Sequence, residues 1–405
     1  MTAAKNRRDN RPAITAAFYR GGTSKGVVFK REDLPPTRAE RDQIFAQVLG
    51  SPDPYQRQLD GMGGGFSSVS KVVIVAPSDD PAADVDYTFG QVSVASPEVD
   101  YRAMCGNMAS VIGPFAVEEG MVTVDDGPVT VRVFNTNTAK YYDCCFEVIG
   151  GLPAEKGGFE ISGVGGTGAP VELVFRDPAG AATSGLLPSG RPVDELSLTD
   201  FPSIAASLVD ATNPVVFIDA ADLGLSGTEL PDQIEATEGL MERLDQIRRA
   251  GGVLMGLGTE PAAVPLSNPK IAIVSPPAPF VTSAGVQHTG AAFDIAVRMV
   301  SMDRAHKAVT LTGAMCLGVA ARVPGTIPYR LARSNDQVDH DTGQNTDQDI
   351  NQTPRSGILN IGHPSGLIAA DADLSFADDG TSQVRSVTGF RTQRRLMQGT
   401  VLLAR

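Results

Sequence analysis

The chain contains an internal repeat, and this repeat constrains the fold more than any other feature of the sequence. Residues 89–116 and 293–321 both run from an apolar, strand-like segment through a polar turn into small residues that begin a helix. Cys-Gly-Asn at 105–107 in the first copy aligns with Thr-Gly-Ala at 312–314 in the second. Two copies of one unit suit a chain of 405 residues, which exceeds what a single hydrophobic core usually supports. We therefore predict a duplicated fold.

The secondary structure is predicted to be rich in short strands. The chain has 43 glycines, 28 prolines and no tryptophan, which is typical of many tight turns between short elements. Residues 37–50 favour a helix that ends at Gly50, because glycine suits the left-handed conformation of a helix C-cap. The other elements expected are strands at 13–19, 26–30, 71–76, 85–95, 214–219, 271–275 and 292–300, and helices at 232–249 and 311–322. This pattern predicts an α+β fold.

The charge and the apolar runs exclude two classes of partner. The formal net charge is -13, and no basic cluster lies away from the termini, so a nucleic-acid partner is not expected. The longest apolar runs, such as residues 72–76, have the length of a strand and not the ~20 residues of a membrane span. Residues 1–12 are basic but lack a following apolar stretch, so they predict a disordered tail and not a signal peptide. We expect a cytoplasmic protein.

Several common sites are excluded by their own spacing rules. The four cysteines are too irregularly spaced for a disulfide framework or a zinc site, and the four histidines show no ligand spacing, so we expect no metal. The G-x-G-x-x-G match at 163–168 leads into a proline and a strand-like run, whereas a dinucleotide fingerprint must open a helix. Lys71 is flanked by Ser70 and Val72, which breaks the P-loop pattern.

Cys105 is the first candidate for chemistry. It stands at the predicted start of a helix, where free backbone N–H groups and the helix dipole favour a thiolate. The same N–H groups form a site for a substrate carboxylate beside the sulfur. The alternative is that Cys105 is a small buried hydrophobic residue, as free cysteines often are.

Lys71 is the second candidate. It follows a loop rich in glycine and serine, which can expose backbone donors to an anion, and it precedes an apolar strand. The alternative is a lysine that ends a strand in solvent.

Seven segments together resemble the PrpF family of methylaconitate isomerases, which includes 3-methylitaconate isomerase and 4-oxalomesaconate tautomerase. They occur in matching order between residues 18 and 366: FYRGGTSKGVVF, GMGGGFSSVSKVVIV, CGNMASVIGPFAVEEGMV, VFNTNTAK, GVGGTGAPVEL, HKAVTLTGAMCLGVAARVPGT and IGHPSG. The ending RTQRRLMQGTVLLAR also resembles the last strand of the family. The resemblance therefore covers nearly the whole chain.

The resemblance implies the fold of diaminopimelate epimerase. That fold has two similar α+β domains, each a β-barrel-like sheet wrapped around a central helix, with the active site in the cleft between them. On this chain we expect an N-terminal domain at 13–190 and a C-terminal domain at 191–385. A polar insertion is expected at 333–355, and residues 386–405 are expected to form a terminal strand that returns to the N-terminal domain.

The resemblance also implies the site. Its cysteine and lysine correspond to Cys105 and Lys71, while the second cysteine of the epimerase is replaced here by Thr312. Candidates for binding substrate carboxylates lie in the matched motifs, on donor-rich loops or helix starts: Arg20, Ser24, Ser67, Ser68, Gly106, Asn107, Gly313, Ala314 and Ser365.

The implied function is a cofactor-independent isomerase. It would move a C=C bond by an allylic proton shift, or change its cis/trans geometry, in a small unsaturated di- or tricarboxylate such as methylaconitate, aconitate or methylitaconate. The alternatives are a racemase or epimerase acting at an α-carbon, and a non-catalytic carboxylate-binding protein. The expected partner is the small-molecule substrate, and a homodimer is compatible with the sequence.

Overall fold

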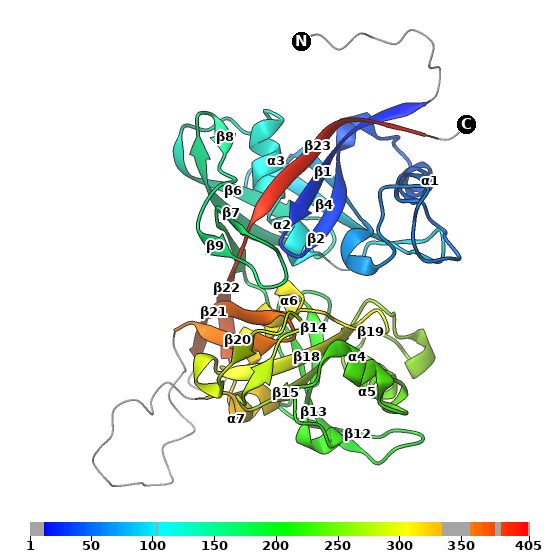
Figure 1. Cartoon of the computed structure of the whole chain (residues 1–405), viewed down its shortest axis with the longest axis vertical. Helices are drawn as coiled ribbons and strands as arrows, with labels where there is room; N and C mark the ends of the chain where they lie inside the picture. Colours follow the sequence, from blue (N-terminus) through cyan, green and yellow to red (C-terminus); the bar gives the residue numbers. More distant parts are fainter. Residues whose placement is uncertain (1–11, 103, 334–356, 377–381, 404–405) are drawn as a thin grey trace.

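The computed structural model describes residues 12–102, 104–333, 357–376 and 382–403. These residues form two lobes stacked along the long axis of the molecule (Figure 1). The predicted tail and the predicted insertion fall outside the described residues, apart from Pro12 and Arg333. None of the described helices has the length and apolar character needed to cross a membrane.

The first lobe combines the first part of the chain with its last strand. Its strands largely alternate buried and partly buried residues, as in β4, so that one face covers a core. The elements are β1 (Ala13–Gly21), β2 (Ser24–Lys30), α1 (Arg38–Leu49), β3 (Lys71–Pro77), β4 (Val85–Val92), β5 (Val99–Asp100), α2 (Gly106–Ala109), α3 (Ile112–Glu118), β6 (Gly127–Asn135), β7 (Lys140–Ile149), β8 (Leu152–Pro153), β9 (Phe159–Glu160), β10 (Thr167–Gly168), β11 (Val171–Arg176) and β23 (Gln393–Leu402).

The second lobe repeats this plan with longer helices on its outside. Its elements are β12 (Asp194–Leu196), β13 (Ile204–Asp210), β14 (Pro214–Asp219), α4 (Pro231–Ala236), α5 (Leu240–Leu254), β15 (Lys270–Ser275), β16 (Phe280–Val281), β17 (Gln287–His288), β18 (Ile295–Ser301), β19 (Arg304–Ala305), α6 (Leu311–Ala320), α7 (Ile327–Leu331), β20 (Leu359–His363), β21 (Gly366–Phe376) and β22 (Ser382–Arg391). Short 3₁₀ turns, such as Ser67–Val69, occur in both lobes.

A short, apolar helix lies inside each sheet. In the second lobe all ten residues of α6 are buried, and in the first lobe Met108, Ile112 and Phe115 of α2 and α3 lie in the same core cluster as the surrounding strands. A helix that is apolar on every side must be enclosed by other elements. The duplicated plan of a sheet around a central helix follows from this requirement.

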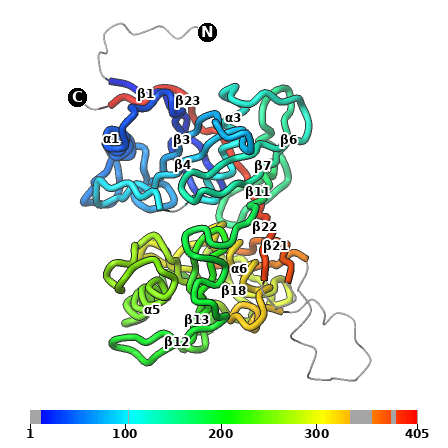
Figure 2. Tube along the Cα trace, turned by 180° about the vertical axis from the view of Figure 1, so that it is seen from behind, coloured from blue at the N-terminus to red at the C-terminus, as the bar shows by residue number. Residues whose placement is uncertain are grey.

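Two strands tie the lobes together. Strand β22 pairs antiparallel with β11 of the first lobe and with β21 of the second, so hydrogen bonding is continuous between them. Strand β23 continues from β22 and pairs antiparallel with β1 along most of its length. Figure 2 shows β22 passing from one lobe to the other beside β11.

Most predicted elements are present, and the α+β class is confirmed. Helix α1 ends at Gly50, whose φ of 76° is left-handed, as the C-cap prediction requires. The helix predicted at 232–249 is instead two helices, α4 and α5, because Gly239 adopts a left-handed conformation between them. The match at 163–168 leads into strand β11, so it does not open a helix.

The division into domains stays a prediction. Within the predicted first domain, Gly180 donates a backbone hydrogen bond to Asp210 of β13, and Leu186 accepts one from it. The end of that segment therefore packs against the second lobe.

Candidate active site

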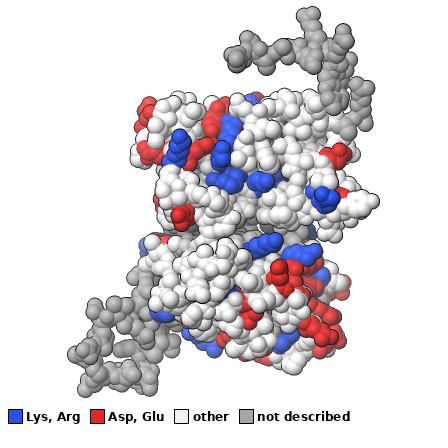
Figure 3. Space-filling view, viewed as in Figure 1, with Lys and Arg blue, Asp and Glu red and all other residues white. Residues whose placement is uncertain are grey.

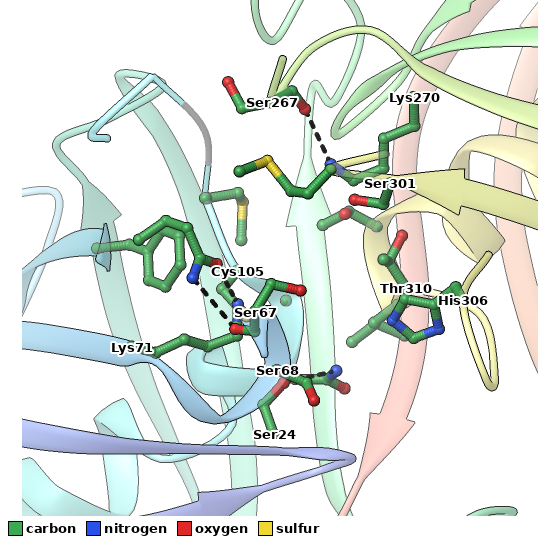
Figure 4. A pocket seen from close by; sticks show the side chains of 18 of the residues that line it. Ser24, Ser67, Ser68, Lys71, Cys105, Ser267, Lys270, Ser301, His306 and Thr310 are labelled. Atoms are coloured by element: carbon green, nitrogen blue, oxygen red, sulfur yellow. Dashed lines mark hydrogen bonds between the residues drawn. The ribbon is translucent and has the colours of Figure 1, made fainter. Parts of the chain in front are cut away.

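The lobes enclose a cavity where the start of α2 faces the start of α6 (Figure 4). The cavity holds about 70 Å³ and is lined by residues from both halves of the chain. Seven predicted site residues contribute to it: Ser24, Ser67, Ser68, Lys71, Cys105, Gly106 and Asn107. The sequence prediction of one shared site for these residues therefore agrees with the geometry.

Lys71 lies inside this cavity and not at a solvated strand end. Its side chain is 7% exposed, and its Nζ donates a hydrogen bond of 2.6 Å to Oε1 of Gln91, the residue opposite it on β4. The amide of Gln91 in turn donates to the carbonyls of Ser67 and Ser70. Burial lowers the pKa of Lys71, and the neighbouring Cys105 opposes this shift. The arrangement favours an oriented lysine that can lose its proton more readily than a surface lysine.

Cys105 lies at the N-cap of α2, with no side chain capping that helix. Its carbonyl accepts hydrogen bonds from the Tyr87 hydroxyl at 3.1 Å and from the Ala109 amide at 2.9 Å, so its backbone is fixed. A helix does start at Cys105, as predicted, but α2 spans only four residues before the chain turns into α3. A large helix dipole is therefore not available, and the charged neighbours of the sulfur matter more.

Arg391 supplies one of these charged neighbours from the end of β22. It is buried, and its Nε donates a hydrogen bond of 2.7 Å to Oδ1 of Asn107. Burial lowers its pKa to about 10, and the Cys105 side chain opposes the shift. The amide of Asn107 donates to Thr23 and Ser24. Asn107 thus anchors the start of α2, and its side-chain bonds are already made within the protein.

The second lobe contributes a lysine and a histidine that the sequence analysis did not select. Burial, together with repulsion from Lys71, lowers the pKa of Lys270 to about 8. Burial lowers the pKa of His306 to about 4, so its imidazole is neutral near pH 7. Its Nδ1 accepts a hydrogen bond from the Ala308 amide, which places the remaining ring proton on Nε2.

The position of the second helix start corrects two predicted binding residues. Helix α6 begins at Leu311, and its N-cap is Thr310, whose hydroxyl accepts a hydrogen bond from the Gly313 amide. The Ala314 amide donates to the Thr310 carbonyl. Gly313 and Ala314 are therefore absent from the cavity lining, which instead includes Thr310 and Thr312. Helix α6 thus begins where the predicted helix at 311–322 begins, but of the aligned Thr-Gly-Ala only Thr312 reaches the cavity.

Two other predicted residues lie outside the inner cavity. The Arg20 guanidinium donates to the carbonyl and hydroxyl of Thr392 at 3.0 and 2.9 Å, which fixes the turn into β23. Ser365 lies in a neighbouring outer cavity of about 670 Å³ and donates to the Lys307 carbonyl. The outer cavity shares Ser67, Ser68 and His306 with the inner one.

The charged side chains on the surface are distributed so that an anion could approach the groove between the lobes. Acidic side chains gather over the part of the second lobe where α4 and α5 lie, and basic side chains border the groove between the lobes (Figure 3). The net charge of -13 therefore does not oppose an acidic substrate at this groove.

Sequence reasoning missed Gln91, Lys270, His306 and Thr310. Gln91 carries no motif of its own, since only strand register brings it to the cavity, whereas His306 begins the matched segment HKAVTLTGAMCLGVAARVPGT but was not selected from it. Lys270 did carry a signal: KIAIVSP at 270–276 resembles KVVIVAP at 71–77. The repeat thus extends to the lysines.

Comparison with known proteins places the chain in a family. The profile described as PrpF protein matches residues 12–404. The chain belongs to the PrpF family. The PrpF chain is similar to the 3-methylitaconate isomerase of Eubacterium barkeri, at 39% identity with 96% of each chain covered. It is also similar to the 2-methyl-aconitate isomerase of Cupriavidus necator, at 35% identity with 96% of each chain covered.

Solved structures support the same placement. A crystal structure of methylitaconate-delta-isomerase matches this PrpF chain with a TM-score of 0.77 and 37% identity, covering 98% of this chain and 96% of the other. A probable proline racemase from Agrobacterium radiobacter matches with a TM-score of 0.53 at 13% identity, covering 96% and 93%, which shows a shared fold alone. The predicted family, the epimerase-type fold and the isomerase class are confirmed.

Proposed function

We propose that this protein is an isomerase that moves a C=C bond, or changes its cis/trans geometry, in a small unsaturated di- or tricarboxylate. One observation carries the proposal: Lys71 and Cys105 come from separate elements and line a single buried cavity between the lobes. The relatives named above act on methylitaconate and methylaconitate, which supports the same substrate class here.

The reaction needs one proton removed and one returned. A base takes a proton from the carbon next to the C=C bond, the electron pair shifts to form a dienolate, and an acid returns a proton at the far carbon of the allyl unit. Neutral Lys71 and the Cys105 sulfur are the proposed proton carriers. Burial of Lys71 makes its neutral form accessible, and Gln91 holds its nitrogen in place.

Hydrogen-bond donors stabilise the charge that develops on the substrate. The dienolate spreads negative charge onto a carboxylate, and groups that are already oriented lower the barrier without reorganisation. The hydroxyls of Ser67 and Ser68, the amides at the start of α2 and Nε2–H of His306 are the proposed donors.

The cavities suit a substrate that is held in two parts. The inner cavity, of about 70 Å³, is much smaller than the outer cavity, of about 670 Å³, so we place the reacting group in the inner one. The remainder of the substrate would extend into the outer cavity past Ser67 and Ser68, which line both.

A substrate screen tests the proposal. The purified protein is incubated with aconitate, 2-methylaconitate, 3-methylitaconate or 4-oxalomesaconate, and ¹H NMR follows the vinyl and allylic signals. We expect an isomeric product from at least one acid, lost in Lys71→Met and kept in Lys156→Met, an exposed lysine outside the cavity. No conversion of any acid would contradict the proposal, and inversion at a saturated α-carbon would favour a racemase.

Three further predictions from the sequence stand as proposals. They are the two domains at 13–190 and 191–385 with a returning terminal strand, a cytoplasmic location and a homodimer. The pairing of β23 with β1 supports the returning strand.

A further inference from the structure

The two lobes each present a lysine to the cavity from the same place in the fold. Lys71 and Lys270 are the first residues of β3 and β15, and four of seven positions are identical between KVVIVAP and KIAIVSP. In the sheet, β3 pairs in parallel with β2 and antiparallel with β4. In the same way, β15 pairs in parallel with β14 and antiparallel with β18. Lys270 is therefore the second-lobe counterpart of Lys71.

The two lysines differ in what holds them. Opposite Lys71, Gln91 accepts a hydrogen bond from the ammonium. On β18 the corresponding place falls to Ser301, which follows Val300 in the register. No hydrogen bond from Lys270 to the Ser301 hydroxyl is recorded among the described residues. Within the described part of the chain, the hydrogen bond recorded for the Lys270 Nζ is to the Ser267 carbonyl, at 3.1 Å. An ammonium has three donors, so Lys270 has two left for a ligand.

The charge around Lys270 is not balanced inside the protein. Asp100, the acidic residue in the described cavity lining, is already ion-paired with Arg102 at 2.8 Å. Lys71 and Arg248 lie close enough to disfavour the charge on Lys270, and Cys105 and Asp100 partly offset them. Lys270 is partly buried, and a cation shielded from water without a dedicated partner is costly unless an anion binds beside it.

We propose that Lys270 binds a carboxylate of the substrate, across the cavity from the proton carriers Lys71 and Cys105. This assignment deepens the proposed function and rests on it for the identity of the reacting molecule. Pairing with a carboxylate uses the free ammonium donors as charge-assisted hydrogen bonds. It also explains why the two lysines differ. Gln91 orients Lys71 for proton transfer, whereas Lys270 keeps ammonium donors for binding the substrate.

Binding without turnover tests the role of Lys270. Tricarballylate, a saturated tricarboxylate that cannot isomerise, is titrated by calorimetry into wild type, Lys270→Met, Lys270→Arg and the surface control Lys156→Met. We expect Lys270→Met to bind roughly 30-fold or more weakly, because it removes one side of a buried charge pair. Lys270→Arg should recover part of the affinity, and Lys156→Met should match wild type.

Two monoamides of tricarballylate, one central and one terminal, identify the interaction. If Lys270 pairs with one carboxylate, the penalty of Lys270→Met should shrink to less than about threefold for the monoamide that lacks it. An unchanged affinity in folded Lys270→Met, an equal penalty for all three ligands, or no binding by wild type would overturn the assignment. Lys270-dependent binding without turnover of any unsaturated acid would refute the isomerase proposal alone.

Discussion

The two lobes share one plan, yet only the first carries a thiol at the start of its central helix; Cys316 of the second lobe lies buried within α6. Cys105 precedes α2 without capping it, whereas Thr310 caps α6 through its hydroxyl. The first lobe leaves its cysteine free for chemistry, and the second uses its hydroxyl to complete a helix. A symmetric pair of bases suits inversion at one carbon, while a shift of a C=C bond moves a proton between two different carbons. The asymmetry therefore favours an isomerase over a racemase.

The largest expected effect separates the two helix starts. Cys105→Ala should lower kcat/KM by about 100-fold to 10,000-fold, the usual contribution of a general acid or base. Thr312→Ala, at the aligned position of the other lobe, should stay within about tenfold because it carries no proton in the proposed reaction. Steady-state kinetics on the best acid from the NMR screen measures both. A similar decrease of kcat/KM in the two variants would contradict the claim that only the helix start of the first lobe carries a proton.

A smaller effect separates the residues opposite the two lysines. Gln91→Leu should lower kcat about 10-fold to 100-fold, because Lys71 loses the acceptor that orients it. That acceptor stabilises the ammonium, so its loss lowers the pKa of Lys71 further and moves the acid limb of the pH–rate profile to lower pH. Ser301→Ala should change neither the rate nor the limb appreciably. A limb that moves to higher pH in Gln91→Leu would contradict the role of Lys71 as the base.

The close approach of the helix starts predicts an effect on stability. A Cβ added at Gly106 would lie 3.1 Å from the Thr312 methyl and 3.2 Å from the Leu311 Cβ. Gly106→Ala should therefore lower the free energy of unfolding by about 1–3 kcal/mol through overpacking. Gly158→Ala is the control, since nothing lies within 4 Å of its added Cβ. Urea denaturation compares the two, and equal stabilities would mean that the lobes do not meet at this point.

The smallest effect concerns the outer cavity. Ser365→Ala should change kcat/KM by less than about threefold, because its hydroxyl already donates to the Lys307 carbonyl and lies away from the inner cavity. Ser24→Ala should cost more, because Ser24 is buried in the inner cavity and accepts a hydrogen bond from Asn107. If Ser365→Ala lowers kcat/KM more than Ser24→Ala does with the same substrate, the substrate makes its main contacts in the outer cavity and the assignment to the inner cavity is wrong.

The sequence predicted the fold, and it selected Lys71 and Cys105, which line one cavity, but it missed several groups around them. Periodicity and capping residues located α1. The motifs around Lys71 and Cys105 are contiguous in the sequence, so the family resemblance could be followed residue by residue and assigned both residues to one site. Gln91 reaches the site through strand register alone, so no local pattern marks it. Arg391 begins the matched ending RTQRRLMQGTVLLAR, but only the strand that crosses between the lobes brings it to the site. The sequence located the start of α6 but did not reveal that Thr310 caps it, so it did not show that Gly313 and Ala314 lie inside the helix and outside the cavity lining.

Deuterium exchange in the single variants tests the central claim most directly. Wild type, Cys105→Ala and Lys71→Met are incubated in D₂O with the same acid, and ¹H NMR separates loss of the substrate hydrogen from formation of product. If the two residues serve two different carbons, both variants should fail to isomerise, while one of them still exchanges the substrate hydrogen for deuterium. Isomerisation at the wild-type rate in either variant would contradict the assignment of Lys71 and Cys105 as the proton carriers.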